Sequence, residues 1–492
     1  MSKFKTKKVW EIKNYNSYWW MFGWWFKIKN IFRFFFVIWC LILVIFFWKY
    51  LVNAAKTTVN TIWKWTVNIV SEALGKEMKK DQFWNVNILL VWYGGKKHSW
   101  WMLADSIMVA SRNPNLWAIT LVSIPRDLYI NLKWFKSWKI NEVFAVAYRY
   151  NEKDLDEAGK IFWEKLKDIL WLDIPYYALV DFDWFEKVID TLWWLNIFVP
   201  EDIYDSQYPD DEKWIYTTFY LTWWRQKLDW ETALKYARSR HSTSDFDRSS
   251  RQQQIIKALM EQIKSQWVIK NIWKIQELYK NYTEMVDTNI SVDEILGMMQ
   301  YAQNINNVFQ FVLTTHYSEK DRKRSNPWWF LYTPALEAFG WASVILPNWG
   351  HATKVSFYDY IQNFVFYVAH NQEYLIENPK IWIYNAIDQE YSKKVAKKKI
   401  EWVASKIAVK LKKYAFNITD VQNFEWTSSG TIVIIKNFWD YQETIETLKW
   451  FINISEVIAI WSGFTDTWVD MKLIIWNQYV DETLGKTFNY DM

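Results

Sequence analysis

Three short apolar runs in the first half of the chain constrain its fold more than any other feature. They cover residues 86–91, 106–110 and 118–124, contain many β-branched residues, and are bounded by turn-forming residues. Runs of this length and composition are typical of strands that are buried on both faces of a sheet. The sequence therefore predicts that these segments form the centre of a covered sheet.

Helical periodicity alternates with strand-like runs further along the chain. Apolar residues recur with helical spacing over residues 154–170 and 185–192, and another strand-like run, residues 177–180, lies between them. Strands that alternate with helices are typical of layered α/β domains. We therefore predict a layered α/β domain over residues 86–313, with a mixed central sheet flanked by helices.

The last part of the chain repeats this alternation on a smaller scale. Residues 314–379 have a less regular pattern, which we interpret as an extension or linker. Residues 380–492 contain three strand-like runs separated by two segments with helical spacing. In chain order these segments are residues 381–386, 394–411, 431–435, 441–451 and 471–475. We predict a second, small α/β domain with the order βαβαβ.

An apolar segment near the N-terminus has the length of a membrane span. Residues 34–55 are apolar or aromatic apart from Lys49 and Asn53, and about 20 such residues cross a bilayer. Residues 1–33 carry eight Lys or Arg residues against the single acid Glu11, which predicts that this basic segment is cytoplasmic. We therefore predict a single-pass protein of the cell membrane with a helical stem at residues 56–85 and an extracytoplasmic C-terminal bulk.

Two other interpretations of the apolar segment stay open. A cleaved signal peptide is less consistent with the chain, because the apolar stretch begins late and Asn53-Ala54-Ala55 is a weak cleavage signal. A buried core helix is the second alternative.

Charge and cysteine content exclude several classes of protein. The net charge of +5 is small and its basic residues are dispersed or N-terminal, so no nucleic-acid partner is predicted. The single cysteine, Cys40, excludes a disulfide within the chain. The sequence contains no Walker phosphate loop and no Cys/His cluster with metal spacing, and none of its five histidines lies in a catalytic-triad motif.

The balance of tryptophan and glycine is abnormal. The chain has 39 Trp and 11 Gly, and Gly normally makes up roughly 7% of residues. Six Trp-Trp pairs would read naturally as Gly-Gly loops; they start at Trp19, Trp24, Trp100, Trp193, Trp223 and Trp328. We interpret most of these tryptophans as UGA codons that the source organism decodes as glycine. A protein that is truly rich in tryptophan, with aromatic sugar-binding platforms, is the alternative.

Four arginines stand close together in the middle of the chain. Arg238, Arg240, Arg248 and Arg251 occupy fourteen residues, and no Lys lies between Tyr236 and Gln254. Guanidinium groups are preferred over ammonium groups where phosphate is bound in a planar, bidentate manner. This composition indicates recognition of a phosphate group.

The apolar spacing after these arginines predicts where they point. Ile255, Leu259 and Ile263 recur every four residues and mark the buried side of a helix whose predicted N-cap is Asp247. Continuing this stripe back by four residues reaches Arg251, with Arg248 and Gln252 beside it. Arginines are unfavourable at a helix N-terminus unless an anion lies there. The alternative is a surface helix with ordinary ion pairs to Glu231, Asp245 and Asp247.

The string ALKYARSR…DFDRSSRQQ resembles the hallmark of the LytR–CpsA–Psr (LCP) family. Its members are membrane-anchored enzymes that transfer glycopolymers from polyprenyl-pyrophosphate lipids to the bacterial cell wall. The resemblance implies that Arg240, Arg248 and Gln252 contact pyrophosphate and that Arg238 and Arg251 complete the cluster. Residues 380–492 resemble the LytR C-terminal domain of the same proteins.

A second part of the family pattern supplies the metal and further charge. LADSIMVAS resembles the strand whose Asp binds Mg²⁺, which implies that Asp105 is a metal ligand, and VSIPRDLYI implies that Arg126 is catalytic. Many members carry another Asp ligand where this chain reads WYGGKKH. The resemblance implies a Mg²⁺-dependent phosphotransferase whose acceptor is peptidoglycan or another envelope polymer. The alternative is a non-enzymatic envelope protein that binds polyprenyl phosphates or anionic polymers as a sensor or scaffold.

Overall fold

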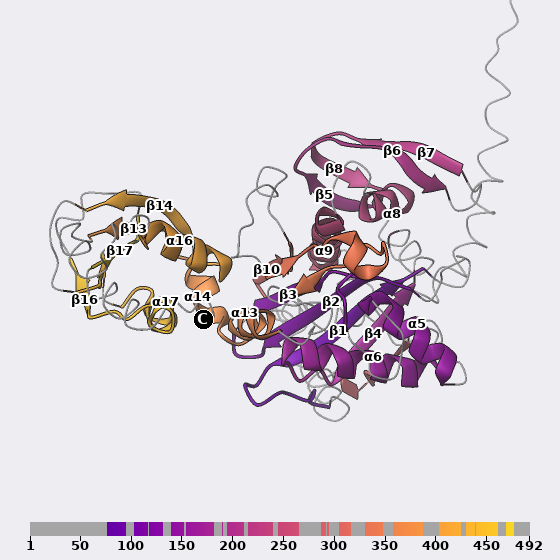
Figure 1. The fold of residues 1–492 in the computed structure, drawn as a ribbon, viewed down its shortest axis with the longest axis horizontal. Helices are drawn as coiled ribbons and strands as arrows, with labels where there is room; N and C mark the ends of the chain where they lie inside the picture. The colour runs from indigo at the N-terminus through magenta and orange to yellow at the C-terminus, as the bar shows by residue number, and fades with distance from the viewer. Residues whose placement is uncertain are drawn as a thin grey trace, which may run out of the picture. The chain divides into compact units, whose positions relative to one another are not determined.

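The fold was analysed in a computed structural model, drawn in Figure 1. The structure describes residues 76–94, 103–116, 118–130, 139–151, 154–181, 189, 194–210, 215–239, 245–264, 287–291, 293–294, 305–315, 330–347, 358–386, 403–424, 430–437, 439–460 and 469–476. The basic segment, the predicted membrane helix and most of the stem lie outside these ranges. None of the helices within them has the length and hydropathy needed to cross a bilayer.

The largest sheet has six strands in the order β10-β3-β2-β1-β4-β9. β2 pairs with β3 antiparallel, whereas β10 pairs with β3 in parallel, so the sheet is mixed as predicted. The strands are β1 (Val86–Tyr93), β2 (Ala104–Asn113), β3 (Ala118–Ile124), β4 (Tyr176–Asp181), β9 (Asp287–Thr288) and β10 (Asn307–Val312). Every residue of β3 is buried, which agrees with the prediction of a covered central strand.

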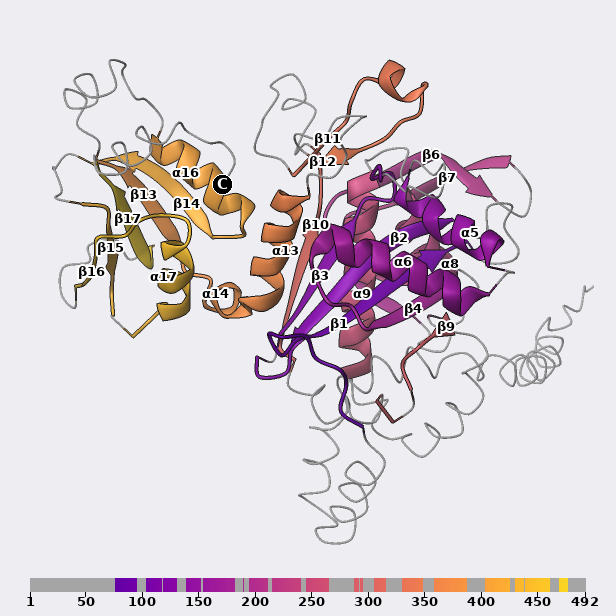
Figure 2. The same cartoon turned by 60° about the horizontal axis from the view of Figure 1, so that its bottom comes forward.

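Two helices cover one face of this sheet. α5 (Ile140–Tyr150) and α6 (Leu155–Leu170) lie side by side along strands β1 and β2 (Figure 2). Phe144 and Phe162 meet edge-on between the helices, with ring centroids 6.2 Å apart. The helix predicted over residues 154–170 is confirmed, α5 was not predicted, and the helix predicted over residues 185–192 lies outside the described residues except for Ile189.

The chain divides into two compact units, and residues 178–304 belong to the first. Within this unit, two antiparallel strand pairs precede two helices. The pairs are β5 (Leu195–Val199) with β8 (Trp224–Leu228) and β6 (Ile203–Asp210) with β7 (Ile215–Leu221). The helices are α8 (Trp230–Arg238) and α9 (Asp245–Lys264).

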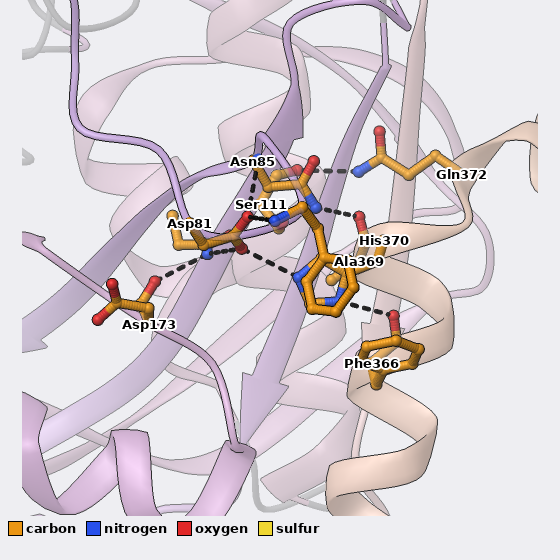
Figure 3. A network of polar contacts seen from close by, with 10 residues as sticks. Asp81, Asn85, Ser111, Asp173, Phe366, Ala369, His370 and Gln372 are labelled. Atoms are coloured by element: carbon orange, nitrogen blue, oxygen red, sulfur yellow. Dashed lines mark hydrogen bonds and ion pairs between the residues drawn. The ribbon is translucent and has the colours of Figure 1, made fainter.

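Residues 358–379, part of the predicted linker, form two helices of the second unit. α13 (Asp359–His370) ends against the strands, where side chains donate to its last carbonyl oxygens. Thr120 Oγ1 donates to Val368 O at 2.6 Å, and Asn85 Nδ2 donates to Ala369 O at 2.9 Å (Figure 3). The next helix, α14 (Gln372–Glu377), is held by Gln372, which donates to Ser111 O. The bonds to Val368 O and Ala369 O satisfy carbonyl groups that a helix end leaves without an internal partner.

A buried aspartate and histidine lie at the centre of the same contact (Figure 3). Asp81 Oδ2 is 3.0 Å from His370 Nε2, and both side chains are under 5% exposed. Asp81 also accepts hydrogen bonds from Asn85 N and Asn87 Nδ2, while His370 Nδ1 faces Phe366 O at 3.1 Å. Because both ring nitrogens face oxygen acceptors, neither is free to activate a nucleophile, and the pair is structural.

We expect Asp81→Asn to destabilise the protein by about 3 kcal/mol at neutral pH, because it removes a buried carboxylate that accepts hydrogen bonds from His370, Asn85 and Asn87. Burial raises the pKa of Asp81, but the hydrogen bonds from His370, Asn85 and Asn87 outweigh it and hold the pKa below its usual range. A carboxyl group whose pKa is lower in the folded chain than in the unfolded chain stabilises the folded state above a pH of about 4. This stabilisation is lost as the pH falls through the pKa of the folded state. Urea unfolding from neutral to acidic pH should therefore show the difference between the variant and the original chain shrinking in acid. The exposed Asp173, paired with Lys167, is the matched control, and Asp173→Asn should cost under about 1 kcal/mol.

Within its described residues, the C-terminal domain has five strands instead of the predicted three, in the order β14-β13-β17-β15-β16. The predicted strands correspond to β13 (Ile381–Asn385), β15 (Ile432–Ile435) and β17 (Met471–Ile475). The βαβαβ prediction was wrong because it missed the edge strands β14 (Ile418–Asn423) and β16 (Glu456–Ala459), whose side chains are mostly not buried. An edge strand needs no continuous apolar run, so the pattern on which the prediction depended is weak there. The helices are α16 (Val403–Lys413), which packs against β13 and β14 (Figure 2), and α17 (Gln442–Lys449).

Several tryptophans adopt a backbone conformation that suits glycine. Among the described residues, seven non-glycine residues have positive φ, and four of them are Trp84, Trp171, Trp224 and Trp341, with φ of 68°, 56°, 107° and 67°. All four side chains are exposed. Trp171 directly follows the last residue of α6, the position at which helices commonly end with a left-handed glycine. The backbone therefore has the shape that glycine would provide at these four positions.

Candidate functional site

The arginine cluster is built on the pair of helices α8 and α9. Asp229 caps α8, its side chain accepting a hydrogen bond from Thr232 N at 2.8 Å. Ala233, Tyr236 and Ala237 form the buried side of the helix, and α8 packs against α9. This packing places Arg238 at the C-terminal end of α8, where a positive side chain complements the helix dipole.

α9 begins at Asp245, two residues before the predicted N-cap, so the prediction of Asp247 as the cap was wrong. Asp247 lies in the first turn instead, where its negative charge still favours the helix dipole. The predicted buried side is confirmed. Arg248 and Arg251 are each 6% exposed and Gln252 is 1% exposed. Arginine is rarely buried to this degree unless its charge is compensated.

Arg251 is engaged with the backbone at the end of α8. Its Nε donates to Tyr236 O at 3.0 Å, and Nη2 donates to Ser239 O. Its guanidinium also lies 5.9 Å from the centre of the Tyr236 ring. Burial raises the pKa of Tyr236 to about 12, so its phenol stays protonated and donates to Gln254 Oε1 at 2.5 Å.

Arg238 and Arg240, the other two arginines, flank Ser239 in the sequence. The Arg238 guanidinium lies 5.7 Å from the centre of the Tyr208 ring, within the distance of a cation–π interaction. Ser239 is fully buried, and its Oγ donates to Asp205 Oδ2 at 2.9 Å. Arg240 lies outside the described residues. Asp205 had not been identified from the sequence, because a single aspartate in a strand carries no recognisable pattern.

Asp105 and Arg126 form an ion pair in the second unit. Arg126 Nη1 lies 2.6 Å from Asp105 Oδ1, and the side chains are 19% and 24% exposed respectively. The sheet register explains this contact. Ile107 of β2 pairs with Ile124 of β3, so continuing the antiparallel register by two residues brings Asp105 opposite Arg126, on the same face of the sheet.

The turn that carries Arg126 is held on two sides. Arg126 O accepts a hydrogen bond from Asn141 N at the start of α5, and Asp127 O accepts one from Ile345 N. The Asp127 carboxylate lies 2.7 Å from Lys139 Nζ and 3.9 Å from Arg126 Nε. The Asp127 carboxylate is therefore engaged by basic side chains.

The carboxylates of this turn fit a metal only in part. No group of three or more His, Cys, Asp or Glu side chains that could hold a metal occurs in the part of the chain that the structure describes. Asp105 is the one predicted ligand, and its Oδ1 pairs with Arg126. Mg²⁺ is often bound by one or two carboxylates together with substrate phosphates and water. The carboxylate of Asp105 has the oxygen chemistry that such a site uses. Lys96, Lys97 and His98 lie outside the described residues.

Comparison with known proteins gives a consistent family match. The sequence profile of the LytR_cpsA_psr family matches residues 49–339. The polyisoprenyl-teichoic acid–peptidoglycan teichoic acid transferase TagV of Bacillus subtilis is 31% identical over 199 residues, which are 40% of this chain and 47% of that protein. The regulatory protein MsrR of Staphylococcus aureus is 29% identical over 187 residues, 38% of this chain and 51% of MsrR. The chain thus spans about half the length of these relatives.

Solved structures of the same group also match the chain. The crystal structure of B. subtilis TagV aligns with 24% identity and a TM-score of 0.41, covering 59% of this chain and 98% of that one. A structure described as the LytR-CPS2A-psr family protein YwtF (TagT) with bound octaprenyl pyrophosphate lipid aligns with 18% identity and a TM-score of 0.38, covering 59% and 93%.

Proposed function

This chain belongs to the LytR_cpsA_psr family, and we propose that it is a membrane-anchored phosphotransferase that moves a glycopolymer from a polyprenyl-pyrophosphate carrier to the cell wall. The substrate is a polyprenyl-pyrophosphate-linked glycan, and the acceptor is a hydroxyl group of peptidoglycan or another envelope polymer. The relative TagV is named for transfer of teichoic acid to peptidoglycan, which supports this class of reaction.

The observation that carries the proposal is the burial of Arg248 and Gln252 on the first turns of α9. A helix N-terminus already favours an anion through its free N–H groups and its dipole. A guanidinium on the same turn adds positive charge to this end of the helix, which favours an anion further. Pyrophosphate is such an anion, and its oxygens match the planar fork of an arginine.

Five of the predicted residues have a direct role in this reaction. Arg240, Arg248 and Gln252 hold the pyrophosphate. The acceptor oxygen forms a bond to the glycan-side phosphorus while the phosphoanhydride bond breaks and polyprenyl phosphate leaves. Arg126 either neutralises the charge that develops during this step or helps to activate the acceptor hydroxyl. Asp105 would hold a Mg²⁺ ion, which would supply further positive charge to the phosphate oxygens when bound.

Hydrolysis of a polyprenyl pyrophosphate tests the activity without knowledge of the glycan. We expect the full-length chain in detergent micelles to release phosphate from this lipid with Mg²⁺ present, and EDTA to slow the release on the order of 100-fold. Arg240→Ala should abolish it, whereas Arg225→Ala, which changes an exposed arginine of β8, should leave it unchanged. Phosphate release that is insensitive to EDTA would contradict the proposed role of Mg²⁺. Phosphate release that persists in Arg240→Ala would show that the arginine cluster does not take part in the reaction.

A non-enzymatic lipid-binding scaffold is the second candidate. It is favoured by the pairing of Asp105 with Arg126 and by the lack of a second carboxylate in the WYGGKKH segment. A metal site with fewer carboxylates binds divalent cations more weakly. Tight binding of the lipid by the unaltered chain, without any phosphate release, would favour the scaffold over the transferase.

The proposed location is the cell membrane, with the basic segment of residues 1–33 in the cytoplasm and residues 56–492 outside it. The excess of positive charge before the apolar segment supports this orientation. A reporter enzyme that is active only outside the cytoplasm, fused after residue 492, should be active. An inactive fusion with normal abundance would contradict the topology.

A further inference from the structure

We propose that Asp205, Ser239 and Arg251 form a positioning network that fixes the C-terminal end of α8, and that Arg251 acts through this backbone instead of contacting the substrate phosphates. The effect on catalysis rests on the proposed function, whereas the effect on the backbone does not. No pattern in the sequence indicated Asp205, and the family resemblance had placed Arg251 only within the general arginine cluster.

The Arg251 guanidinium donates hydrogen bonds to the backbone at the end of α8. Nε and Nη2 donate to the carbonyl oxygens of Tyr236 and Ser239. These carbonyls belong to the last turn of α8 and its C-cap residue, where carbonyl groups lack partners inside the helix. A guanidinium can reach both because its donors diverge in a rigid fork, which a lysine ammonium lacks. Arg251 therefore closes the end of α8 from the neighbouring helix α9.

Asp205 contacts Ser239 through the serine hydroxyl. Asp205 is 1% exposed and lies in β6 where the pairing with β7 shifts its register. Its Oδ1 accepts a hydrogen bond from Gln207 N at 3.1 Å within this irregular segment, and its Oδ2 accepts from Ser239 Oγ at 2.9 Å. Ser239 is thus held through its hydroxyl by β6 and through its carbonyl by α9.

Electrostatics couple the two ends of the network. Burial lowers the pKa of Arg251, while Tyr236, Asp247, Asp205 and Glu201 act in the opposite direction. Asp205 therefore supplies negative charge that helps to keep the buried guanidinium ionised. A buried charge needs such compensation, since leaving one member alone is costly.

The location of Ser239 explains why this network matters for the site. Ser239 stands between Arg238 and Arg240 in the sequence, so restraining its hydroxyl and carbonyl restrains the backbone that leads to both side chains. A misplacement of about 1 Å in a group that aligns a substrate can cost about 100-fold in rate. Loss of the network should therefore reduce the rate of the chemical step more than it weakens binding.

The test compares Arg251→Lys and Asp205→Asn with the unaltered full-length chain, using Arg225→Lys as the matched control. Hydrogen exchange measured by mass spectrometry should become faster over residues 235–239 in both variants and stay unchanged in the control. With geranylgeranyl pyrophosphate as the probe, kcat should fall about 100-fold while KM changes less than about threefold. Lysine keeps the charge but cannot bridge two carbonyls, so it should not rescue the rate.

Two results would overturn the proposal. The first is normal exchange over residues 235–239 in Arg251→Lys, and the second is a raised KM at unchanged kcat, which would make Arg251 a phosphate contact. If the unaltered chain neither binds nor cleaves the probe, the proposed function is wrong. The hydrogen-exchange measurement still tests whether the three residues restrain the end of α8.

Ser239→Ala serves if Arg251→Lys or Asp205→Asn does not fold, because it removes only the hydroxyl that donates to Asp205. It should also speed exchange over residues 235–239. In combination with Asp205→Asn it should add little to either single change, since both act on the same contact between residues 205 and 239. Fully additive effects would contradict a shared network.

Discussion

We expect the protein isolated from its native source to contain glycine, not tryptophan, at positions 84, 171, 224 and 341. The backbone at each of these positions has a positive φ that a side chain with a Cβ rarely adopts. A left-handed conformation costs an L-residue roughly 1–2 kcal/mol, whereas glycine adopts it without that cost. Peptide mass spectrometry of the native protein across these positions measures the residue directly. Peptides with intact indole side chains at all four positions would exclude the recoding.

The same conformations predict a gain in stability when glycine is restored in a chain made with tryptophan. Relief of strain exceeds the added entropy of the unfolded chain by about 0.5–1 kcal/mol per position. For four separated positions this amounts to about 2–4 kcal/mol, which thermal unfolding of the quadruple variant would detect. Trp450→Gly is the matched control, because Trp450 is also exposed but has a right-handed φ of −68°. That control should be neutral or slightly destabilising, and an equal gain there would disprove the strain argument.

Replacing Arg248 should cause the largest loss of activity among the described residues of the arginine cluster. Arg248 combines burial with a position in the first turn of α9. Removing a donor aimed at developing charge typically costs 10²–10³-fold in rate, so we expect a fall of about this size in kcat for Arg248→Gln, measured as phosphate release from a polyprenyl pyrophosphate. Arg248→Lys should recover only part of it, because an ammonium keeps the charge but not the fork.

Controls separate this effect from a loss of folding. Arg248→Gln keeps most of the side-chain volume, so its thermal unfolding should stay close to that of the original chain, and Arg225→Gln should change neither property. An unchanged rate in a folded Arg248→Gln protein would remove this residue from the site. A fall in lipid binding without any measurable cleavage in either protein would instead favour the scaffold.

The central strands and the buried side of α9 could be predicted because buried positions carry apolar residues in regular runs or spacings along the sequence. The run 118–124 is apolar throughout since both faces of β3 are covered. Arg251 was correctly placed on the buried side because Ile255, four residues later, lies on the same helical face. The start of α9 was misplaced because Asp245 and Asp247 are both chemically suited to the N-terminal end of a helix.

Elements with exposed or irregular surroundings could not be predicted. The strand pair β6 and β7 has several exposed aromatic side chains, including Tyr204, Tyr216 and Tyr220. The aromatic residues of these strands therefore do not indicate which face is buried. The edge strands β14 and β16 were missed for the related reason that they contain few buried side chains. Asp81 and His370 are 289 residues apart in the chain, and nothing local to either residue indicates the other.

The sequence by itself determined the family, the α/β class and the arginines of the candidate site, because these depend on residue types at short, regular spacings. Only the tertiary structure decided how those side chains are used. It showed that Arg251 donates to the carbonyls of α8, that Asp205 holds Ser239, and that Asp105 pairs with Arg126. Hydrogen bonds of this kind depend on distance and direction in space. These distances and directions are fixed only when separate elements pack together, and the residue spacing within one segment does not determine them.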